Sequence, residues 1–333
     1  MSTETNIMNK VIVTITGAAG NIAYSLIFRI LSGNIFPENI KIQINLLDIT
    51  TMLPVLKGVK YEIEDCAFKN LDSILITDKP EEAFSNADYI LLVGAKPRTK
   101  GMQRADLLLD NANIFKNQGI VINDCAKKNT QIIVIGNPAN TNALIIKHFA
   151  SNIPTKNITS LMMLDQNRSK SILSSKINES VENITCLTVW GNHSATQYPD
   201  LSYALINGER AIIENLDSAW IKNDFIPRVQ NRGAEIIEHM GKSSAASAAS
   251  AIYNHLNILV NNSHDWESMG IMSNNDYDIS NEIFYSFPLQ VSNSQINIIN
   301  NLEVSEESVA YLKKTEKELL SERDIIKNIL KGN

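Results

Sequence analysis

Short apolar runs alternate with helical patterns through the first half of the chain. Continuous apolar or β-branched runs predict strands at residues 11–16, 41–47, 73–77, 87–93 and 131–135. Between them, apolar positions recur at helical spacing at residues 21–31, 55–68, 105–126 and 141–149. Strands that alternate with helices pair in parallel through right-handed crossovers. This half therefore predicts an α/β fold with a doubly wound parallel sheet.

The rhythm changes after Ala150. Strand-like runs at residues 157–164 and 184–190 flank a helical pattern at 167–176, and longer helical patterns follow at 219–240 and 243–260. Further strands are predicted at residues 266–273 and 282–292, before a charged amphipathic helix at 305–330. We therefore expect two domains, residues 1–150 with the doubly wound sheet and residues 151–333 with an α+β fold.

Composition and charge narrow the possible classes of protein. The 333 residues are 44% hydrophobic and 20% charged, a globular composition that excludes disordered, collagen-like and coiled-coil chains. Because 36 acidic residues outnumber 30 basic ones, the chain lacks the basic excess that binds a phosphate backbone, and no nucleic-acid partner is expected. The polar first ten residues, and the lack of an apolar stretch of about 18 residues, predict neither a secretory signal nor a membrane span.

The cysteines indicate the redox environment. Cys66, Cys125 and Cys186 are far apart and have neither the spacing of a disulfide framework nor that of a zinc site. We therefore expect no metal centre and a reducing, cytoplasmic location.

A glycine-rich turn joins the first predicted strand to the first predicted helix. It comprises Gly17, Ala18, Ala19, Gly20, Asn21, Ile22 and Ala23. Such a turn brings backbone N–H groups and the positive end of a helix up to a pyrophosphate, although an ordinary strand–helix connection can look alike. Asp48 ends the second predicted strand, where a carboxylate accepts hydrogen bonds from the adenosine ribose and repels a 2′-phosphate. The combination predicts NAD as the cofactor rather than NADP.

Two further segments carry polar side chains at the ends of predicted strands. The loop at residues 94–104 contains four cations and no acid, namely Lys96, Arg98, Lys100 and Arg104. The segment at residues 135–141 contains Asn137, whose amide could face a ligand. Loops at the carboxyl ends of strands are where α/β proteins bind ligands. The ordinary alternatives are a solvated basic loop and an Asx turn before a proline.

The second half contributes Asp165, Arg168 and His193. Asp165 and Arg168 are three positions apart at a predicted helix start and can share one face, but an N-capping Asp with an intrahelical ion pair would have the same spacing. His193 follows a predicted buried strand, whereas the other four histidines fall in helical patterns or a polar loop. A lone histidine is ordinarily a surface or core residue, so His193 gains its significance from the other segments.

Together these side chains supply what hydride transfer from a hydroxy acid requires. A histidine accepts the hydroxyl proton as hydride leaves the carbon. A buried aspartate fixes the histidine tautomer and stabilises the imidazolium. One arginine binds the substrate carboxylate in a bidentate fork, and a second cation polarises the carbonyl oxygen in the reverse reaction.

Five motifs in these segments resemble one known family. They are T-G-A-A-G-N-I-A-Y-S-L, G-M-Q-R-A-D-L-L, G-N-P-A-N-T-N, L-D-Q-N-R and W-G-N-H-S-A-T-Q-Y-P-D. With them the chain resembles, over nearly its whole length, the NAD-dependent malate dehydrogenases of the lactate/malate dehydrogenase superfamily. The resemblance is to the branch that includes cytosolic eukaryotic and many bacterial enzymes, and it implies a Rossmann-type domain followed by a substrate domain.

The resemblance implies a role for each matched residue. His193 is the expected proton acceptor and Asp165 its partner. Four residues are expected to bind substrate: Arg168 the C1 carboxylate, Arg98 the distal carboxylate, Arg104 the reacting carbonyl, and Asn137 both substrate and cofactor. Beyond the glycine-rich turn and Asp48, the expected NAD contacts are Ile135, Gly136, Asn137, Asn111 and Gln118. The branch is usually dimeric, so a homodimer is expected, with helix 55–68 near the subunit contact.

The sequence departs from the family pattern at two places and leaves two alternatives open. Met162 and Met163 replace a usual Thr-Arg pair, and Lys96 replaces a residue that is usually hydrophobic. One alternative is a related, lactate-type 2-hydroxy-acid dehydrogenase, from which Arg98 discriminates because only a second carboxylate needs that counter-charge. The other is a non-catalytic dinucleotide-binding protein, which would have no reason to retain Asp165, His193 and the arginines together.

Overall fold

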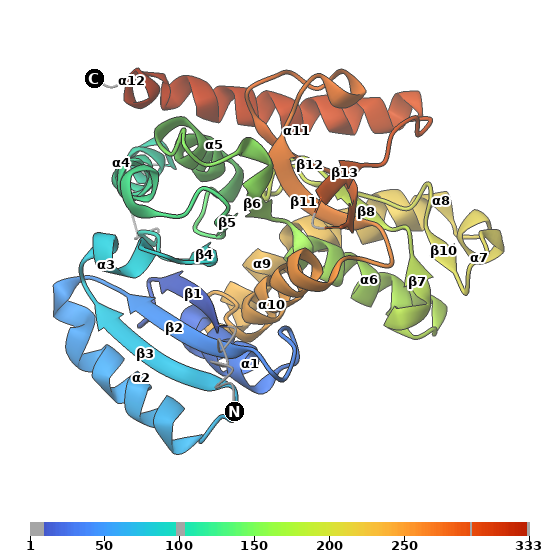
Figure 1. Ribbon diagram of the computed structural model, residues 1–333. Helices are drawn as coiled ribbons and strands as arrows, with labels where there is room; N and C mark the ends of the chain where they lie inside the picture. Colours follow the sequence, from blue (N-terminus) through green and yellow to red (C-terminus); the bar gives the residue numbers. More distant parts are fainter. Residues whose placement is uncertain (1–9, 98–103, 294, 332–333) are drawn as a thin grey trace.

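The fold is described from a computed structural model of the 333-residue chain (Figure 1). The structure describes residues 10–97, 104–293 and 295–331, without the side chain of Arg104. Its central element is a sheet of nine strands in the order β13-β12-β11-β6-β5-β4-β1-β2-β3. The strands of this sheet are β1 (Lys10–Thr16), β2 (Lys41–Leu47), β3 (Leu71–Thr77), β4 (Tyr89–Leu92), β5 (Gln131–Val134), β6 (Ile158–Leu161), β11 (Glu267–Met272), β12 (Phe284–Ser292) and β13 (Gln295–Ile298).

The first six strands form the doubly wound unit. All their pairings are parallel, and their order, β3-β2-β1-β4-β5-β6, reverses between β1 and β4. This is the Rossmann order, in which ligands bind outside the carboxyl ends of the strands where the order reverses. The α/β fold class expected from the alternating pattern is confirmed.

Helices cover both faces of this unit because its strands are apolar on both sides. Ile90, Leu92 and Val134 pack into the core under one set of helices, whereas Leu91 and Ile133 pack into the core on the other face. The helices on the first side are α3 (Pro80–Phe84), α4 (Arg104–Cys125), α5 (Ala139–Phe149) and α12 (Lys327–Leu330); those on the second are α1 (Asn21–Ser32), α2 (Leu53–Asp65) and α10 (Ala246–Asn261).

The second half extends the sheet in antiparallel fashion and adds two small ribbons. β11 pairs with β6, β12 with β11, and β13 with β12, all antiparallel. The ribbons pair β7 (Ile184–Thr185) with β10 (Leu205–Ile206), and β8 (Thr188–Trp190) with β9 (Tyr198–Asp200). The helices are α6 (Met163–Ile177), α7 (Ala211–Glu214), α8 (Ser218–Trp220), α9 (Ile226–Met240) and α11 (Glu306–Ile325). In Figure 1, α11 runs across the top of the view, packed beside α4 and α5.

Several predicted boundaries were wrong. The strand predicted at 157–164 ends at Leu161, and α6 begins at Met163, because a short buried apolar run does not distinguish a strand from a buried helix start. The strand predicted at 184–190 is broken where Cys186 has a positive φ of 54°, so its halves join different ribbons.

Two predicted helices are also interrupted. The pattern at 219–240 contains a π-helical segment, Ile221–Phe225, before α9, and the pattern at 305–330 divides into α11 and α12. Among the α-helices and strands of the described residues, five short elements were not predicted at all: α3, α7, β9, β10 and β13. The division into domains at residue 150 stays a prediction.

Candidate active site

Two backbone segments contact each other where the strand order of the sheet reverses, between β1 and β4. Gly17 follows β1 with a φ of +62°, a conformation that L side chains rarely adopt, and a Cβ there would lie 2.5 Å from the Cα of Gly94. Gly94 follows β4, and its N–H donates to Thr16 Oγ1 at 3.1 Å. Glycine is therefore required on both sides of this contact, which brings the turn after β1 against the loop after β4.

The glycine-rich turn leaves the start of α1 open. Gly20 is the N-cap and supplies no side-chain hydrogen bond to the helix, so a negative group can approach the amides of the first turn. The Ala19 N–H donates to Asp48 Oδ2 at 2.9 Å, which fixes the carboxylate of the second strand beside the turn. Ala18 and Ala23 are fully buried and Ile22 is half-buried, so the turn packs tightly against the sheet. These residues fit a dinucleotide.

Three more of the expected NAD contacts line the adjoining strands and helix. The N–H groups of Ile135 and Gly136 both donate to Leu92 O, at 3.0 and 2.9 Å, which brings the end of β5 beside the end of β4. A Cβ on Gly136 would lie 2.8 Å from the Phe115 ring, so only glycine fits. On α4, Gln118 Oε1 is buried with no hydrogen-bond partner among the described residues, as expected of a group that a cofactor would satisfy.

Asn111, another of the expected NAD contacts, bonds to the backbone of the loop after β4. Its side chain is fully buried, and its amide accepts from Lys96 N at 2.7 Å and donates to Lys96 O at 3.2 Å. It therefore anchors the backbone of the loop after β4 to α4. Lys96 itself is exposed and pairs with Asp110 on α4 at 2.6 Å, so this departure from the family pattern reinforces the same anchor.

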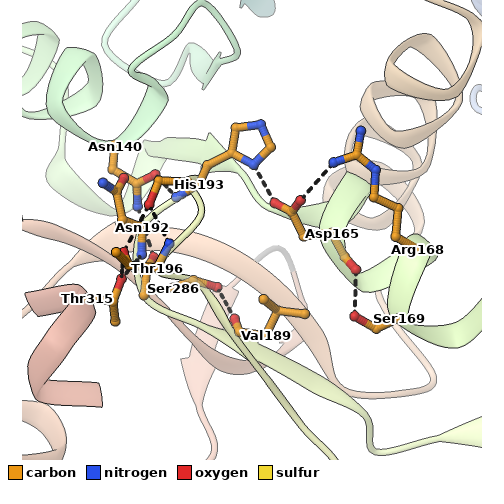
Figure 2. Close-up of polar contacts among 12 residues, drawn as sticks. Asn140, Asp165, Arg168, Ser169, Val189, Asn192, His193, Thr196, Ser286 and Thr315 are labelled. Atoms are coloured by element: carbon orange, nitrogen blue, oxygen red, sulfur yellow. Dashed lines mark hydrogen bonds and ion pairs between the residues drawn. The ribbon is translucent and has the colours of Figure 1, made fainter. Parts of the chain in front are cut away.

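Asp165 joins His193 and Arg168 into one cluster (Figure 2). Asp165 lies in the first turn of α6 and is fully buried. Its Oδ2 contacts His193 Nδ1 at hydrogen-bond distance, and its Oδ1 accepts from Arg168 Nη1 at 3.3 Å. Met162, and not Asp165, occupies the N-cap of α6, so the capping alternative is wrong and the carboxylate faces the histidine instead.

The electrostatics of the cluster define the histidine tautomer. Burial by itself raises the pKa of the Asp165 carboxyl, but the interaction with His193 and the charge of Arg168 together outweigh it, and the pKa lies below its usual range. An ionised carboxylate only accepts hydrogen bonds, so Nδ1 of His193 carries the proton of that contact. Nε2 of the neutral ring is left as an acceptor, which is the state a general base needs.

The cluster borders two cavities. His193 and Asn137 line a pocket of about 300 Å³ that also contacts Leu108 on α4. Arg168 lines a second cavity of about 570 Å³ together with Ala246 and Ser247 at the start of α10. Arg168 uses one nitrogen on Asp165, and guanidinium has five N–H donors, so it retains donors for an anion. Asp165 therefore connects an imidazole, whose chemistry allows it to accept a proton, to a guanidinium with N–H donors left for an anion.

Two of the expected substrate ligands cannot be described. Arg98 lies outside the described residues, and Arg104 begins α4 but its side chain is not described. Met162 and Met163, which replace the usual Thr-Arg pair of the family, are both buried in the hydrophobic core.

Several residues around His193 were missed by the sequence analysis. Asn140 is fully buried; its Oδ1 accepts from His193 N at 3.1 Å, and its amide donates to Gly191 O at 3.2 Å. On α11, Thr315 Oγ1 accepts from Asn192 N at 2.8 Å, and Glu318 contacts the same turn. Asn140 was visible in the G-N-P-A-N-T-N motif, but no local signal marked the residues of α11.

Two other kinds of feature, a metal centre and a membrane-spanning helix, are absent from the described residues. No group of three or more His, Cys, Asp or Glu residues has the arrangement to hold a metal ion. Among the same residues, no helix is both long and apolar enough to span a membrane.

Comparison with known proteins identifies the family. The model of the lactate/malate dehydrogenase NAD binding domain matches residues 11–159, and that of the lactate/malate dehydrogenase alpha/beta C-terminal domain matches residues 162–330. The chain is therefore equipped with an NAD-binding domain, as the glycine-rich turn and Asp48 predicted.

Solved structures agree over almost the whole chain. Malate dehydrogenase from Naegleria fowleri is 41% identical with a TM-score of 0.92, and the match covers 96% of this chain and 98% of that one. Trichomonas vaginalis lactate dehydrogenase, solved with NADH and oxamate, is 34% identical with a TM-score of 0.92, covering 97% of this chain and 100% of that one. Malate dehydrogenase from Plasmodium falciparum, at 21% identity and a TM-score of 0.83 over 96% and 99% of the two chains, shares the fold. On both the family models and these similarities, the chain belongs to the lactate/malate dehydrogenase family.

Proposed function

We propose that this NAD-dependent dehydrogenase interconverts (S)-malate and oxaloacetate. The observation that carries the proposal is the Asp165–His193 contact beside Arg168, because it joins a proton acceptor to a carboxylate-binding cation. The choice of malate rests on Arg98 in the loop after β4 and on the 41% identity to a malate dehydrogenase.

In the proposed reaction, His193 Nε2 accepts the hydroxyl proton of malate. NAD, when bound, would supply the acceptor for the hydride that leaves the carbon bearing that hydroxyl. Asp165 keeps Nδ1 protonated and stabilises the imidazolium that forms. Arg168 holds the C1 carboxylate, Arg98 the distal carboxylate, and Arg104 the oxygen that becomes the carbonyl. Asn137 orients substrate against the cofactor. In the reverse direction His193 returns the proton to the carbonyl oxygen as hydride arrives.

A lactate-type activity is the second candidate, because a lactate dehydrogenase matches this chain at 34% identity and the same TM-score. The deciding experiment is an assay of the purified protein with oxaloacetate and with pyruvate, each with NADH and with NADPH, followed by the absorbance of the reduced nicotinamide. Preference for oxaloacetate with NADH supports the proposal. Preference for pyruvate contradicts malate specificity, and inactivity with both supports a non-catalytic dinucleotide-binding protein.

We also propose a cytoplasmic homodimer with α2 at the subunit contact. Val55 and Tyr61 on α2 are 46% and 52% exposed, and a groove of about 680 Å³ separates α1 from α2. Exposed apolar side chains beside a groove form the kind of surface that a partner subunit can cover. Sedimentation analysis of the wild type and a Tyr61→Glu variant tests the contact, since the charge should favour the monomer. Cell fractionation tests the location.

A further inference from the structure

We propose that Glu318, on the C-terminal helix α11, is a positioning residue that holds the His193 turn in place for proton transfer. The inference rests on the proposed role of His193 but concerns a residue more than 120 positions away in the chain. Its hydrogen bonds are to side chains that flank His193 along the chain, so it acts through the turn and not through the imidazole ring.

Glu318 binds the residues that flank His193. Its Oε2 accepts from Asn192 Nδ2 at 3.0 Å and from Thr196 Oγ1 at 2.6 Å, and it also accepts from Ser194 Oγ. These three donors lie before and after His193 along the turn. Hydrogen bonds to an ionised carboxylate are shorter and stronger than neutral ones, so a single side chain clamps both ends of the turn.

Helix α11 also packs directly against the His193 turn through Thr315. Gly191 has a φ of +95°, and a Cβ there would lie 2.2 Å from Thr315 Cγ2, so a side chain at 191 would push α11 away. Thr315 Oγ1 accepts the Asn192 N–H at 2.8 Å, one turn of helix before Glu318. Figure 2 shows Thr315, Asn192 and Thr196 gathered on one side of His193, with Asp165 on the other.

His193 is consequently held at two points. The ring is fixed by Asp165 on α6, and the main-chain N–H of His193 is fixed by Asn140. The carboxylate of Glu318 in turn binds the side chains of the residues on either side of His193. Proton transfer depends on the position of Nε2 relative to the substrate hydroxyl, and a misplacement of about 1 Å can cost about a hundredfold in rate. Loosening the turn should therefore slow the chemical step without altering the cofactor site.

The central variant is Glu318→Gln, which keeps the size of the side chain and removes its charge. We expect kcat to fall about 10- to 100-fold with the better of oxaloacetate and pyruvate, because the turn loses its charged acceptor. NADH affinity, measured by fluorescence titration, should stay within about twofold, because the glycine-rich turn is remote from α11. The deuterium isotope effect on kcat with 4-deuterated NADH should rise, since hydride and proton transfer become more limiting.

Glu316→Gln is the matched control. Glu316 is another glutamate of α11 and is buried, but it accepts from Ser280 N and Ser280 Oγ, both at 2.6 Å. These hydrogen bonds hold a segment other than the His193 turn. Its replacement should lower the melting temperature while leaving kcat per NADH-binding site and the isotope effect at wild-type values. If Glu318→Gln behaves like Glu316→Gln, Glu318 is merely structural and the proposal is overturned.

Thr196→Val decides the matter if Glu318→Gln does not fold. It removes one of the three donors, and we expect kcat to fall a few fold with a raised isotope effect; wild-type values of both would overturn the proposal. In the Glu318→Gln background it should have little further effect, because both substitutions break the same contact. Failure of the underlying function is distinguishable: His193→Ala would then retain turnover, or the wild type would reduce neither keto acid.

Discussion

The carboxylate of Asp48 accepts a hydrogen bond from the backbone of Ala19, with 2.9 Å between Oδ2 and N. The contact ties the acid that ends β2 to the glycine-rich turn that follows β1. The other carboxylate oxygen of Asp48, Oδ1, accepts from Ile49 N at 2.8 Å. A carboxylate has about four acceptor positions, so these two bonds leave capacity for ribose hydroxyls.

This contact predicts the effect of Asp48 on cofactor choice. In Asp48→Ser the negative charge that repels a 2′-phosphate is lost, and the ratio of kcat/KM for NADH over NADPH should fall by at least about tenfold. Asp48→Asn is the control, because it keeps an acceptor for Ala19 while removing the charge. Both variants should lose preference, and the Asn variant should keep a melting temperature near that of the wild type. An unchanged ratio in both would assign the discrimination to another residue.

Asp165 and His193 should act as one unit. Asp165→Asn can place an N–H opposite Nδ1 and so favour the wrong tautomer; we expect a loss of kcat of at least about a hundredfold. His193→Ala should lose as much while still binding NADH, and the double variant should be little worse than either. Steady-state kinetics of the three variants test this, and losses that multiply would mean that the two residues work independently.

Arg98 and Arg168 should differ in their effects on substrate choice. Oxaloacetate has a second carboxylate and pyruvate has none, so we expect wild-type kcat/KM to favour oxaloacetate by about a thousandfold or more, equivalent to about 4 kcal/mol. Arg98→Gln should lower oxaloacetate activity and raise pyruvate activity. Arg168→Gln should impair both, because each substrate has the C1 carboxylate. If Arg98→Gln leaves the ratio of the two kcat/KM values unchanged, Lys100 and Lys96 are the next candidates for the discriminating cation.

Two buried groups predict how stability depends on pH. Burial lowers the pKa of His255, on α10, from 6.5 to about 3. Below pH 6.5 the unfolded chain binds a proton that the native ring excludes, so the free energy of unfolding falls with decreasing pH by up to about 1.4 kcal/mol per unit. Burial raises the pKa of Glu267 from 4.5 to about 8, so its contribution falls instead as pH rises from 4.5 to about 8.

Between pH 4.5 and 6.5, the unfolded-state pKa values of Glu267 and His255, the two groups change the free energy of unfolding in opposite directions. Urea unfolding across that window should show a weak pH dependence in the wild type. His255→Gln should become less stable with rising pH, because only the Glu267 contribution remains, and Glu267→Gln should become more stable with rising pH. Identical pH slopes in the wild type and His255→Gln would rule out a neutral buried imidazole.

The doubly wound sheet and the NAD turn were predictable because their signals are local. Parallel strands buried on both faces are apolar throughout, so they can be recognised in the sequence. A positive φ, as at Gly17, favours glycine, so the residue type itself indicates the turn. The candidate catalytic residues were found because Asp165, Arg168 and His193 each lie in a short motif whose residue types carry the chemistry. Boundaries failed where one apolar run served two elements, as at Leu161 and Met163.

The sequence by itself thus determined the alternation of strands and helices in the first half, the dinucleotide turn and the chemical types at the site. Only the tertiary structure decided which groups meet: Asp165 with His193 and not as a helix cap, Asn111 with the backbone of Lys96, and α11 with the His193 turn. The Thr315–Asn192 contact spans 123 positions. No periodicity or motif encodes such a pairing, because it depends on how α11 packs against the rest of the folded chain.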